Sequence, residues 1–230
     1  MMFTILKKNS YFLLFFNKRL FNTPMNNKVK IYDERLAFSL KDYLNLKIKS
    51  KTKYKYFENI LYFYFDLSDK NRKTFIKKII DNLDSDLLCY RANKDTELEK
   101  IQSETFDPLV LFVKEKFRLD FKVKNSIIPF KQDNNNIIIL NKILKELDDV
   151  RFTTYYFINN LTNSNLIALN FLVNNIKLED VWNCLSLDET YSFRKWGRDK
   201  DAVEMLNNKK KDLDEIINFH LLFNKKEILK

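Results

Sequence analysis

The feature that most constrains this chain is its glycine content, because only Gly197 is present among 230 residues. Phosphate-binding loops of the Walker and dinucleotide types need several glycines, so that backbone N–H groups can approach the phosphates. A nucleophile elbow needs two flanking glycines, and the single histidine, His220, leaves no His/Cys cluster at zinc spacing. The sequence therefore excludes nucleotide-binding enzymes of these types, a nucleophile elbow and a His/Cys zinc cluster, and we expect a protein without catalytic residues, cofactor or metal.

The charge of the chain is strongly basic, with 41 Lys+Arg against 31 Asp+Glu and a formal net charge of +10. Two interpretations are open. The excess can be background, since lysine is used throughout the chain, or it can mark a patch for an acidic partner or a nucleic acid. Lysines alternate with other residues from Lys47 to Lys55, beside Tyr54 and Tyr56, and aromatics next to lysines can stack on bases.

The two cysteines, Cys89 and Cys184, lie far apart in the sequence. We expect them to be reduced, buried and to act as small hydrophobic residues. His220 lies between Phe219 and Leu221, which favours a core or rim position over a catalytic one.

The N-terminal 32 residues contain six basic residues and no acidic one, as mitochondrial presequences do. The pattern nevertheless predicts strands at 2–6, 11–16 and 28–31, separated by polar turns, with a helix beginning at Asp33. The apolar run YFLLFF is too short to span a bilayer. We therefore expect this segment to be folded protein.

The remainder of the chain has helical periodicity. Helices are predicted at 70–83, after Thr96, after Asp107-Pro108, and at 137–148, 150–161, 163–175, 178–185, 187–196 and 200–223. The polar stretch 126–136 is a candidate hinge. The predicted fold class is α+β, with a small antiparallel β-rich N-terminal domain that also contains helices (residues 1–125) and an α-helical C-terminal domain (residues 126–230).

Several helix ends are marked by capping patterns. Thr96 with Glu99, and Ser186 with Glu189, are spaced as capping boxes, and Asp107-Pro108 is typical of an N-cap followed by the first helical position. Trp196-Gly197 is typical of a helix end, after which Asp199 is expected to cap the last helix.

Two motifs of the sequence are chemically dense. The first, DLLCYRA followed by a glutamine and FDPL, contains Leu87, Leu88, Cys89, Tyr90, Arg91, Leu98, Gln102, Phe106, Asp107 and Pro108. The second contains Leu187, Asp188, Glu189, Tyr191, Ser192, Trp196, Gly197 and Asp199. Both motifs resemble those of a known family, the ATP-twelve assembly chaperones of the F-type ATP synthase in mitochondria and alphaproteobacteria, in which tryptophan stands in place of Phe106 and glutamine in place of Ser192. Arg19, Thr23 and Pro24 extend the resemblance to the N-terminus.

This resemblance implies a non-catalytic assembly chaperone that binds the unassembled alpha subunit of the catalytic sector, without nucleotide and without membrane insertion. The partner-binding candidates are Glu189, Asp188, Trp196, Tyr90 and Arg91. A helix-capping role is an equally good interpretation of Asp188 and Glu189, and an internal pair is a slightly better one of Tyr90 and Arg91. We expect a monomer in the bacterial cytoplasm, or in the mitochondrial matrix if the protein is eukaryotic, since the match begins too early to leave room for a presequence.

Two other functions remain open from the residues alone. A basic RNA-binding or ribosome-associated protein would explain the charge, and its binding would weaken steeply with salt. A hydrolase using Asp188 and Glu189 as paired acids is disfavoured, because adjacent helix residues do not face each other.

Overall fold

The computed structural model describes residues 2–50 and 55–224, and the contacts of the chain divide it into two compact units. The first unit is residues 1–68 with 218–230, and the second is residues 69–217. The expected domain boundary between residues 125 and 126 lies inside the second unit, so it does not coincide with this division. No helix in the described part of the chain is both long and apolar enough to cross a membrane.

The first unit begins with an antiparallel sheet, as predicted. The strands are β1 (Phe3–Lys8), β2 (Tyr11–Phe16), β3 (Arg19–Leu20) and β4 (Lys30–Ile31), and both β3 and β4 pair with β2. The β1–β2 turn contains Asn9 with a φ of 53°, a left-handed conformation that asparagine tolerates better than most residues.

One face of this sheet is closed by α1 (Glu34–Lys49), which begins at the N-cap Asp33, as predicted. Phe3, Leu14 and Ile31 are almost fully buried on the sheet side, and Ala37, Leu40 and Leu44 are buried on the helix side. Asn45 of α1 fixes the start of β1, since its side chain accepts from the N–H of Phe3 and donates to the carbonyl of Phe3.

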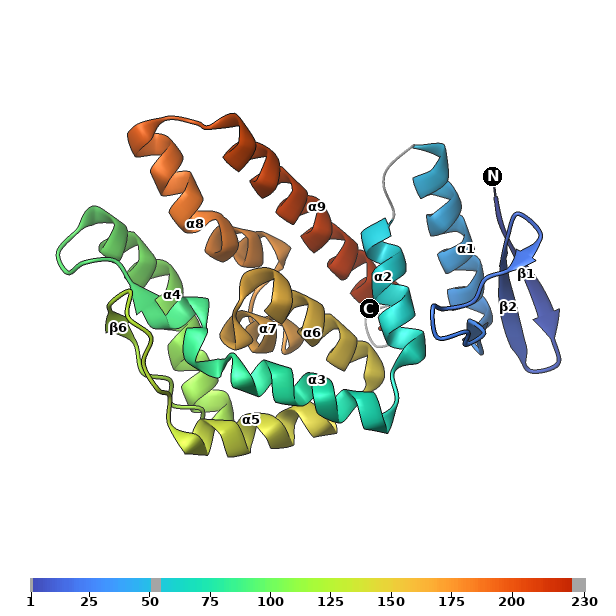
Figure 1. Ribbon diagram of the computed structural model, residues 1–230, viewed down its shortest axis with the longest axis horizontal. Helices are drawn as coiled ribbons and strands as arrows, with labels where there is room; N and C mark the ends of the chain where they lie inside the picture. Colours follow the sequence, from blue (N-terminus) through green and yellow to red (C-terminus); the bar gives the residue numbers. More distant parts are fainter. Residues whose placement is uncertain (1, 51–54, 225–230) are drawn as a thin grey trace. The chain divides into compact units, whose positions relative to one another are not determined.

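The first unit also contains α2 (Lys55–Asp66) and the end of the last helix (Figure 1). The Thr23 hydroxyl donates to Asp66 at 2.5 Å, and the Asn27 side chain donates to the same carboxylate at 2.8 Å. These bonds tie the loop before β4 to α2. The rings of Phe219 and Phe223, from the last helix, pack against Tyr64 of α2. Residues 51–54 of the lysine-rich segment lie outside the described residues.

The second unit is helical, apart from two short 3-10 turns and one parallel pair of two-residue strands. Its helices are α3 (Asp69–Asp81), α4 (Glu97–Phe117), α5 (Asn134–Glu146), α6 (Asp149–Thr162), α7 (Asn165–Leu172), α8 (Leu178–Trp196) and α9 (Lys200–Phe223), the last of which ends in the first unit. The strands are β5 (Tyr90–Arg91) and β6 (Lys124–Asn125). All eight residues of α7 are buried, and this helix contacts α4, α6 and α8. The predicted α+β class is therefore confirmed.

Two predicted helix starts are wrong. Pro108 lies inside the continuous helix α4, where its missing N–H cannot bond to the preceding turn, and Asp107 pairs with Arg91 instead of capping. Ser186 lies inside α8, and its hydroxyl donates to the carbonyl of Trp182. A run of helix-compatible residues on either side continued each helix through the apparent cap.

The other helix ends are capped as predicted, except that the Thr96–Glu99 capping box is half formed, since the N–H of Thr96 donates to the carbonyl of Asn93. The Thr96 hydroxyl accepts from the N–H of Glu99, and the Asp199 carboxylate accepts from the N–H of Ala202. Gly197 ends α8 with a φ of 90°, a conformation that residues with a Cβ rarely adopt. Cys89 and Cys184 are buried free thiols, and His220 is buried.

Candidate partner-binding site

The DLLCYRA segment begins with Asp86, a fully buried carboxylate at the start of α7. Asp86 accepts from the Ser164 hydroxyl at 2.7 Å and from the N–H groups of Asn165 and Leu166 at 2.6 and 3.2 Å. It also accepts from the N–H of Leu88 at 3.1 Å. Burial raises the pKa of Asp86 to about 6, and these hydrogen bonds oppose the rise. The carboxylate thus fixes the central helix to this segment, in a position where an anion suits a helix N-terminus.

Tyr90 and Arg91 are directed into the second unit by the contacts they make. The Tyr90 hydroxyl donates to the carbonyl of Asp84 at 2.6 Å, and its ring packs against Phe130. The side chain of Arg91 is only 2% exposed, and its guanidinium pairs with Asp107 at 2.6 Å and lies over the ring of Phe106. Arg91 also donates to the carbonyl of Leu88 at 2.6 Å. These contacts make the internal-pair interpretation the stronger one for both residues.

Gln102 joins the first motif to the second. It is buried on α4, where its Oε1 accepts from the N–H of Ala92 at 2.7 Å and its Nε2 donates to Asp188 of α8 at 2.8 Å. Asp188 is half-buried on the side of α8 that meets α4. The matching glutamine and aspartate of the two motifs are therefore in direct contact, and they hold β5, α4 and α8 together.

Glu189, the next residue, is half-exposed, and its carboxylate lies 3.2 Å from the ammonium of Lys209 on α9. This pair connects α8 to α9 at the surface. It does not cap a helix, because Glu189 lies in the interior of α8.

The end of α8 meets the start of α4 in an aromatic and ionic cluster. We call it the α8 end cluster, and it consists of Glu97 of α4 and Tyr191, Arg194, Lys195 and Trp196 of α8. Glu97 pairs with Arg194 at 2.5 Å and with Lys195 at 2.7 Å. Hydrogen bonding from Lys195, followed by the charges of Lys195 and Arg194, lowers the pKa of Glu97. The ring of Tyr191 lies edge-on to Trp196, with centroids 6.4 Å apart.

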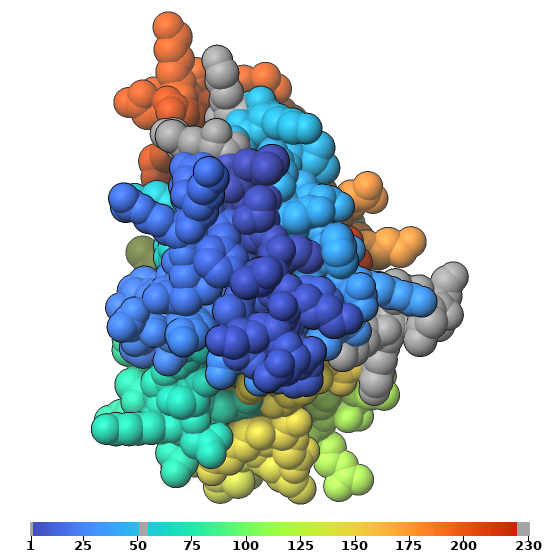
Figure 2. Space-filling view, turned by 90° about the vertical axis from the view of Figure 1, so that its right-hand side faces the viewer, coloured from blue at the N-terminus to red at the C-terminus, as the bar shows by residue number. Residues whose placement is uncertain are grey.

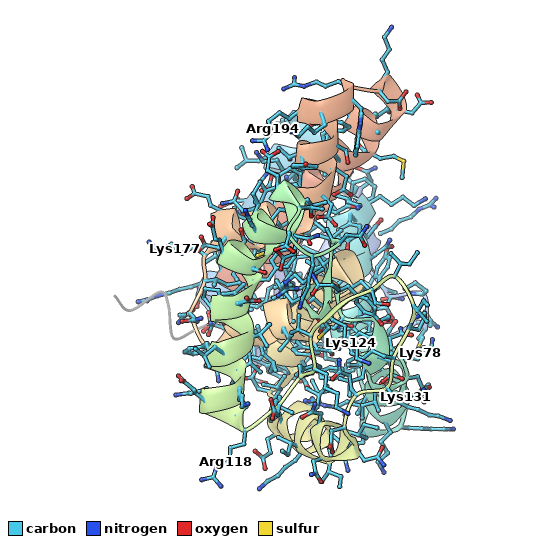
Figure 3. The ribbon with its side chains drawn as sticks, turned by 90° about the vertical axis from the view of Figure 1, so that its left-hand side faces the viewer. Lys78, Arg118, Lys124, Lys131, Lys177 and Arg194 are labelled. Carbon is cyan, nitrogen blue, oxygen red and sulfur yellow. The ribbon has the colours of Figure 1, made fainter. Side chains whose placement is uncertain are left out.

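Trp196 is the most accessible of the predicted site residues, with 79% of its surface exposed. A shallow pocket of about 360 Å³ lies beside Tyr191 and Arg194, and its other lining residues on α4 and α8 are Ile101, Thr105, Asn183, Ser186, Leu187 and Thr190. Figure 3 shows Arg194 on α8, close to the N-terminal end of α4. Trp196 does not line this pocket, but its ring meets that of Tyr191, which does. Large aromatic side chains are enriched among the residues that anchor protein interfaces.

The predicted site residues thus fall into two groups in the second unit. Asp188, Glu189 and Trp196 lie along α8. Tyr90 and Arg91 form β5, and Gln102 bonds to the residue that follows this strand, Ala92. Sequence reasoning missed Asp86 and Glu97 as site-forming residues. The only signal for Asp86 was its place at the head of the first motif, and that for Glu97 was its position in the first turn of a helix. Among the described residues no group of three His, Cys, Asp or Glu side chains is placed to hold a metal ion.

Both the sequence and the fold of this chain are similar to those of known proteins. Residues 3–114 match the model of the family described as ATP12 chaperone protein. The fold resembles the crystal structure of Atp12 from Paracoccus denitrificans, with a TM-score of 0.80, 19% identity and 96% of each chain covered. It also resembles Atu1473, a putative chaperone from Agrobacterium tumefaciens, with a TM-score of 0.81 and 20% identity over 97% of this chain and 84% of that one. No curated protein sequence matches significantly.

The resemblance to the ATP12 chaperone family is confirmed. The match to the ATP12 family model includes the first motif, with Tyr90, Arg91 and Gln102, and it ends before α8. Asp188, Glu189 and Trp196 lie outside that match, in a part of the chain where the Paracoccus Atp12 structure shows a shared fold.

Proposed function

We propose that this protein is a non-catalytic assembly chaperone of the F-type ATP synthase, which binds the unassembled alpha subunit of the catalytic sector. The observation that carries the proposal is the match of residues 3–114 to the ATP12 chaperone family, together with a fold shared with Paracoccus Atp12 over 96% of both chains. The two motifs that define the resemblance are in physical contact through Gln102 and Asp188.

The physical task of such a chaperone is to cover an apolar surface. A subunit of a ring-shaped enzyme buries apolar surface against its neighbours, and this surface is exposed and prone to aggregation before assembly. A protein that covers the surface transiently keeps the subunit available until the beta subunit replaces it. Covering requires a binding surface and no reaction chemistry.

Trp196 and Glu189 are the best-placed candidates for this binding surface. Trp196 offers a large exposed ring with few contacts of its own, and Tyr191 supports it from one side. Glu189 has one partner, Lys209, at the surface, and exposed ion pairs of this kind contribute only about 0–1 kcal/mol. A cation of the partner could therefore replace Lys209 at low cost.

The experiment that tests the proposal follows the refolding of the ATP synthase alpha subunit by light scattering, in the presence and absence of the purified protein. Beta subunit serves as the control partner, and size-exclusion chromatography tests for co-elution. Suppressed aggregation and co-elution with alpha, but not with beta, is the expected result. An unchanged scattering trace with alpha would refute the proposal.

Two variants locate the contact. We expect Trp196→Ala and Glu189→Lys to weaken suppression of alpha aggregation without changing the melting temperature by more than a few degrees. Met205→Ala is the matched control, because Met205 is an exposed apolar residue of α9 that belongs to neither motif. Equal activity of all three variants would remove α8 from the binding surface.

A further inference from the structure

The net positive charge of the protein comes from one of its two units. The second unit, residues 69–217, contains 25 Lys+Arg and 25 Asp+Glu, and so has no net charge. The first unit contains 16 Lys+Arg and 6 Asp+Glu, which accounts for the whole formal charge of +10. A general excess of lysine would give both units a positive net charge. The excess of basic over acidic residues is instead a property of the first unit alone.

Within the first unit, residues 1–32 contain six basic residues and no acidic one. All six side chains are exposed: Lys7, Lys8, Lys18, Arg19, Lys28 and Lys30. Lys7 lies 3.9 Å from Glu34, and no ion pair within the described residues involves the other five. These cations are therefore available to a partner.

The register of the strands shows which side chains share the face of the sheet that α1 does not cover. Three rows run across the strands on this face: Thr4 with Phe15 and Leu20, Leu6 with Leu13 and Lys30, and Lys8 with Tyr11. Tyr32 continues the third row, since its ring lies 6.0 Å from that of Tyr11. We call this surface the outer sheet face; β1 and β2 are drawn in dark blue in Figure 2.

The outer sheet face is apolar where the free face of an antiparallel sheet is usually polar. Leu6 is 55% exposed and Tyr32 is 68% exposed, Tyr11, Phe15 and Leu20 are half-buried, and Leu13 is buried among them. Lys8 and Lys30 lie at the edges of this apolar surface, and the ammonium of Lys30 sits 5.3 Å from the centre of the Tyr11 ring. An apolar centre with a basic rim is the composition of a protein interface.

We infer that the outer sheet face is a second contact surface for the client protein, and that it takes a segment of the client in which carboxylates flank apolar side chains. The apolar residues of the segment would pack on Leu6 and Phe15, and its carboxylates would pair with Lys8 and Lys30. That the client is the alpha subunit depends on the proposed function. The complementary charges would mainly accelerate association and select the segment.

The chemistry of the face favours a protein over a nucleic acid or a lipid surface. Leu6, Leu13 and Leu20 of this face offer neither donors for base edges nor rings on which bases could stack. The ammonium of Lys30 lies 5.3 Å from the centre of the Tyr11 ring, where a stacked base would have to displace it. Phe15 and Leu20 are only partly exposed, so they suit side-chain packing better than insertion into a bilayer.

The test compares charge-reversal variants in the alpha-subunit refolding assay. Lys8→Glu/Lys30→Glu reverses two charges on the outer sheet face, and Leu6→Thr removes its most exposed aliphatic side chain. The control is Lys116→Glu/Lys142→Glu, which makes the same charge change at exposed lysines of α4 and α5 in the second unit. Circular dichroism melts verify that all variants fold.

We expect the Lys8/Lys30 variant to need at least about tenfold more protein for half-suppression of scattering at low salt, with a smaller deficit at 0.5 M NaCl, since salt screens exposed charges. Leu6→Thr should show a deficit that salt does not alter, and the control should match the wild type. If the wild type binds alpha and the Lys8/Lys30 variant binds it equally well, the inference is overturned while the proposed function stands. If the wild type does not act on alpha at all, the proposed function itself fails. Loss of binding to RNA or to phosphatidylglycerol vesicles in the Lys8/Lys30 variant, with alpha binding unchanged, would also overturn the inference and assign the face to that ligand.

Discussion

Replacing Gln102 by leucine tests whether the two motifs of this protein are joined by structure or serve only to bind a partner. The substitution keeps the approximate volume of the side chain and removes both of its hydrogen bonds, to the N–H of Ala92 at 2.7 Å and to Asp188 at 2.8 Å. Gln102 is buried and these bonds are partly shielded from water, so each lost partner is left poorly satisfied. At about 1–2 kcal/mol for each bond, we expect Gln102→Leu to lower the free energy of unfolding by about 2–4 kcal/mol.

The assay is urea unfolding followed by circular dichroism, with thermal melts in parallel. For a chain of this size the melting temperature falls by about 2–4 °C per kcal/mol, so a decrease of roughly 4–16 °C is expected. Glu104→Leu is the control, because Glu104 is exposed on the same helix and the substitution keeps a good helix former. A double-mutant cycle with Asp188→Ala should give a coupling energy of about 1 kcal/mol or more.

A third variant at this position tests the electrostatics. Gln102→Glu keeps an oxygen for Ala92 but places a second carboxylate against Asp188. Like charges at this distance repel, so the variant should be less stable than the wild type at pH 7, and acidification should recover part of the loss. The reasoning is refuted if Gln102→Leu changes the stability by less than about 0.5 kcal/mol and shows no coupling to Asp188.

Three further predictions concern single positions. Burial raises the pKa of Asp86 to about 6, above an unfolded value of about 3.9, so its contribution to stability is complete below pH 3.9 and is lost as the pH rises through 6. In urea unfolding across pH 4 to 6.5, the wild type should therefore lose stability, by up to about 3 kcal/mol, and Asp86→Asn should lack this decline. Parallel curves of stability against pH for the two proteins would contradict the assignment. Gly197→Ala should lower the free energy of unfolding by about 1–3 kcal/mol, because φ is 90° there although nothing lies within 4 Å of the added Cβ; an unchanged melting curve would show that the helix end adapts. Burial raises the pKa of the Cys89 thiol, so a thiol reagent should label Cys89 only after denaturant is added, and rapid labelling of the native protein would show that the segment opens.

Much of the fold was predictable because local chemistry and tertiary structure agree. The short β-prone apolar runs of β1 and β2, the helix start at the acidic Asp33, and the stop at Gly197 all act within a few residues, and each appears as predicted. The predictions that failed have one cause in common. Asp107 and Ser186 are good capping residues, but each lies within a stretch whose apolar periodicity continues, and packing of the whole helix outweighs a cap of about 1 kcal/mol.

The candidate site was less predictable, because its geometry depends on contacts between distant residues. Gln102 and Asp188 are 86 positions apart, and nothing in either motif indicates that they touch. The helix N-terminus that Asp86 holds belongs to residues 164–166, which carry no unusual composition. Partner-binding roles for the five candidate residues remain predictions, but their surroundings now differ enough to rank them.

The ranking follows from what each residue would give up on binding a partner. Arg91 has a 2% exposed side chain held by Asp107 and by the carbonyl of Leu88, so turning it outward would break a buried pair, which costs about 3–5 kcal/mol. Asp188 would have to abandon the buried amide of Gln102. Glu189 would exchange one exposed cation for another, and Trp196 would give up little except water. A transient chaperone must release its client, so its contact residues should be those that bind without rearranging its own core. By this criterion we expect Glu189 and Trp196 to face the partner, and Tyr90, Arg91 and Asp188 to build the framework that presents them.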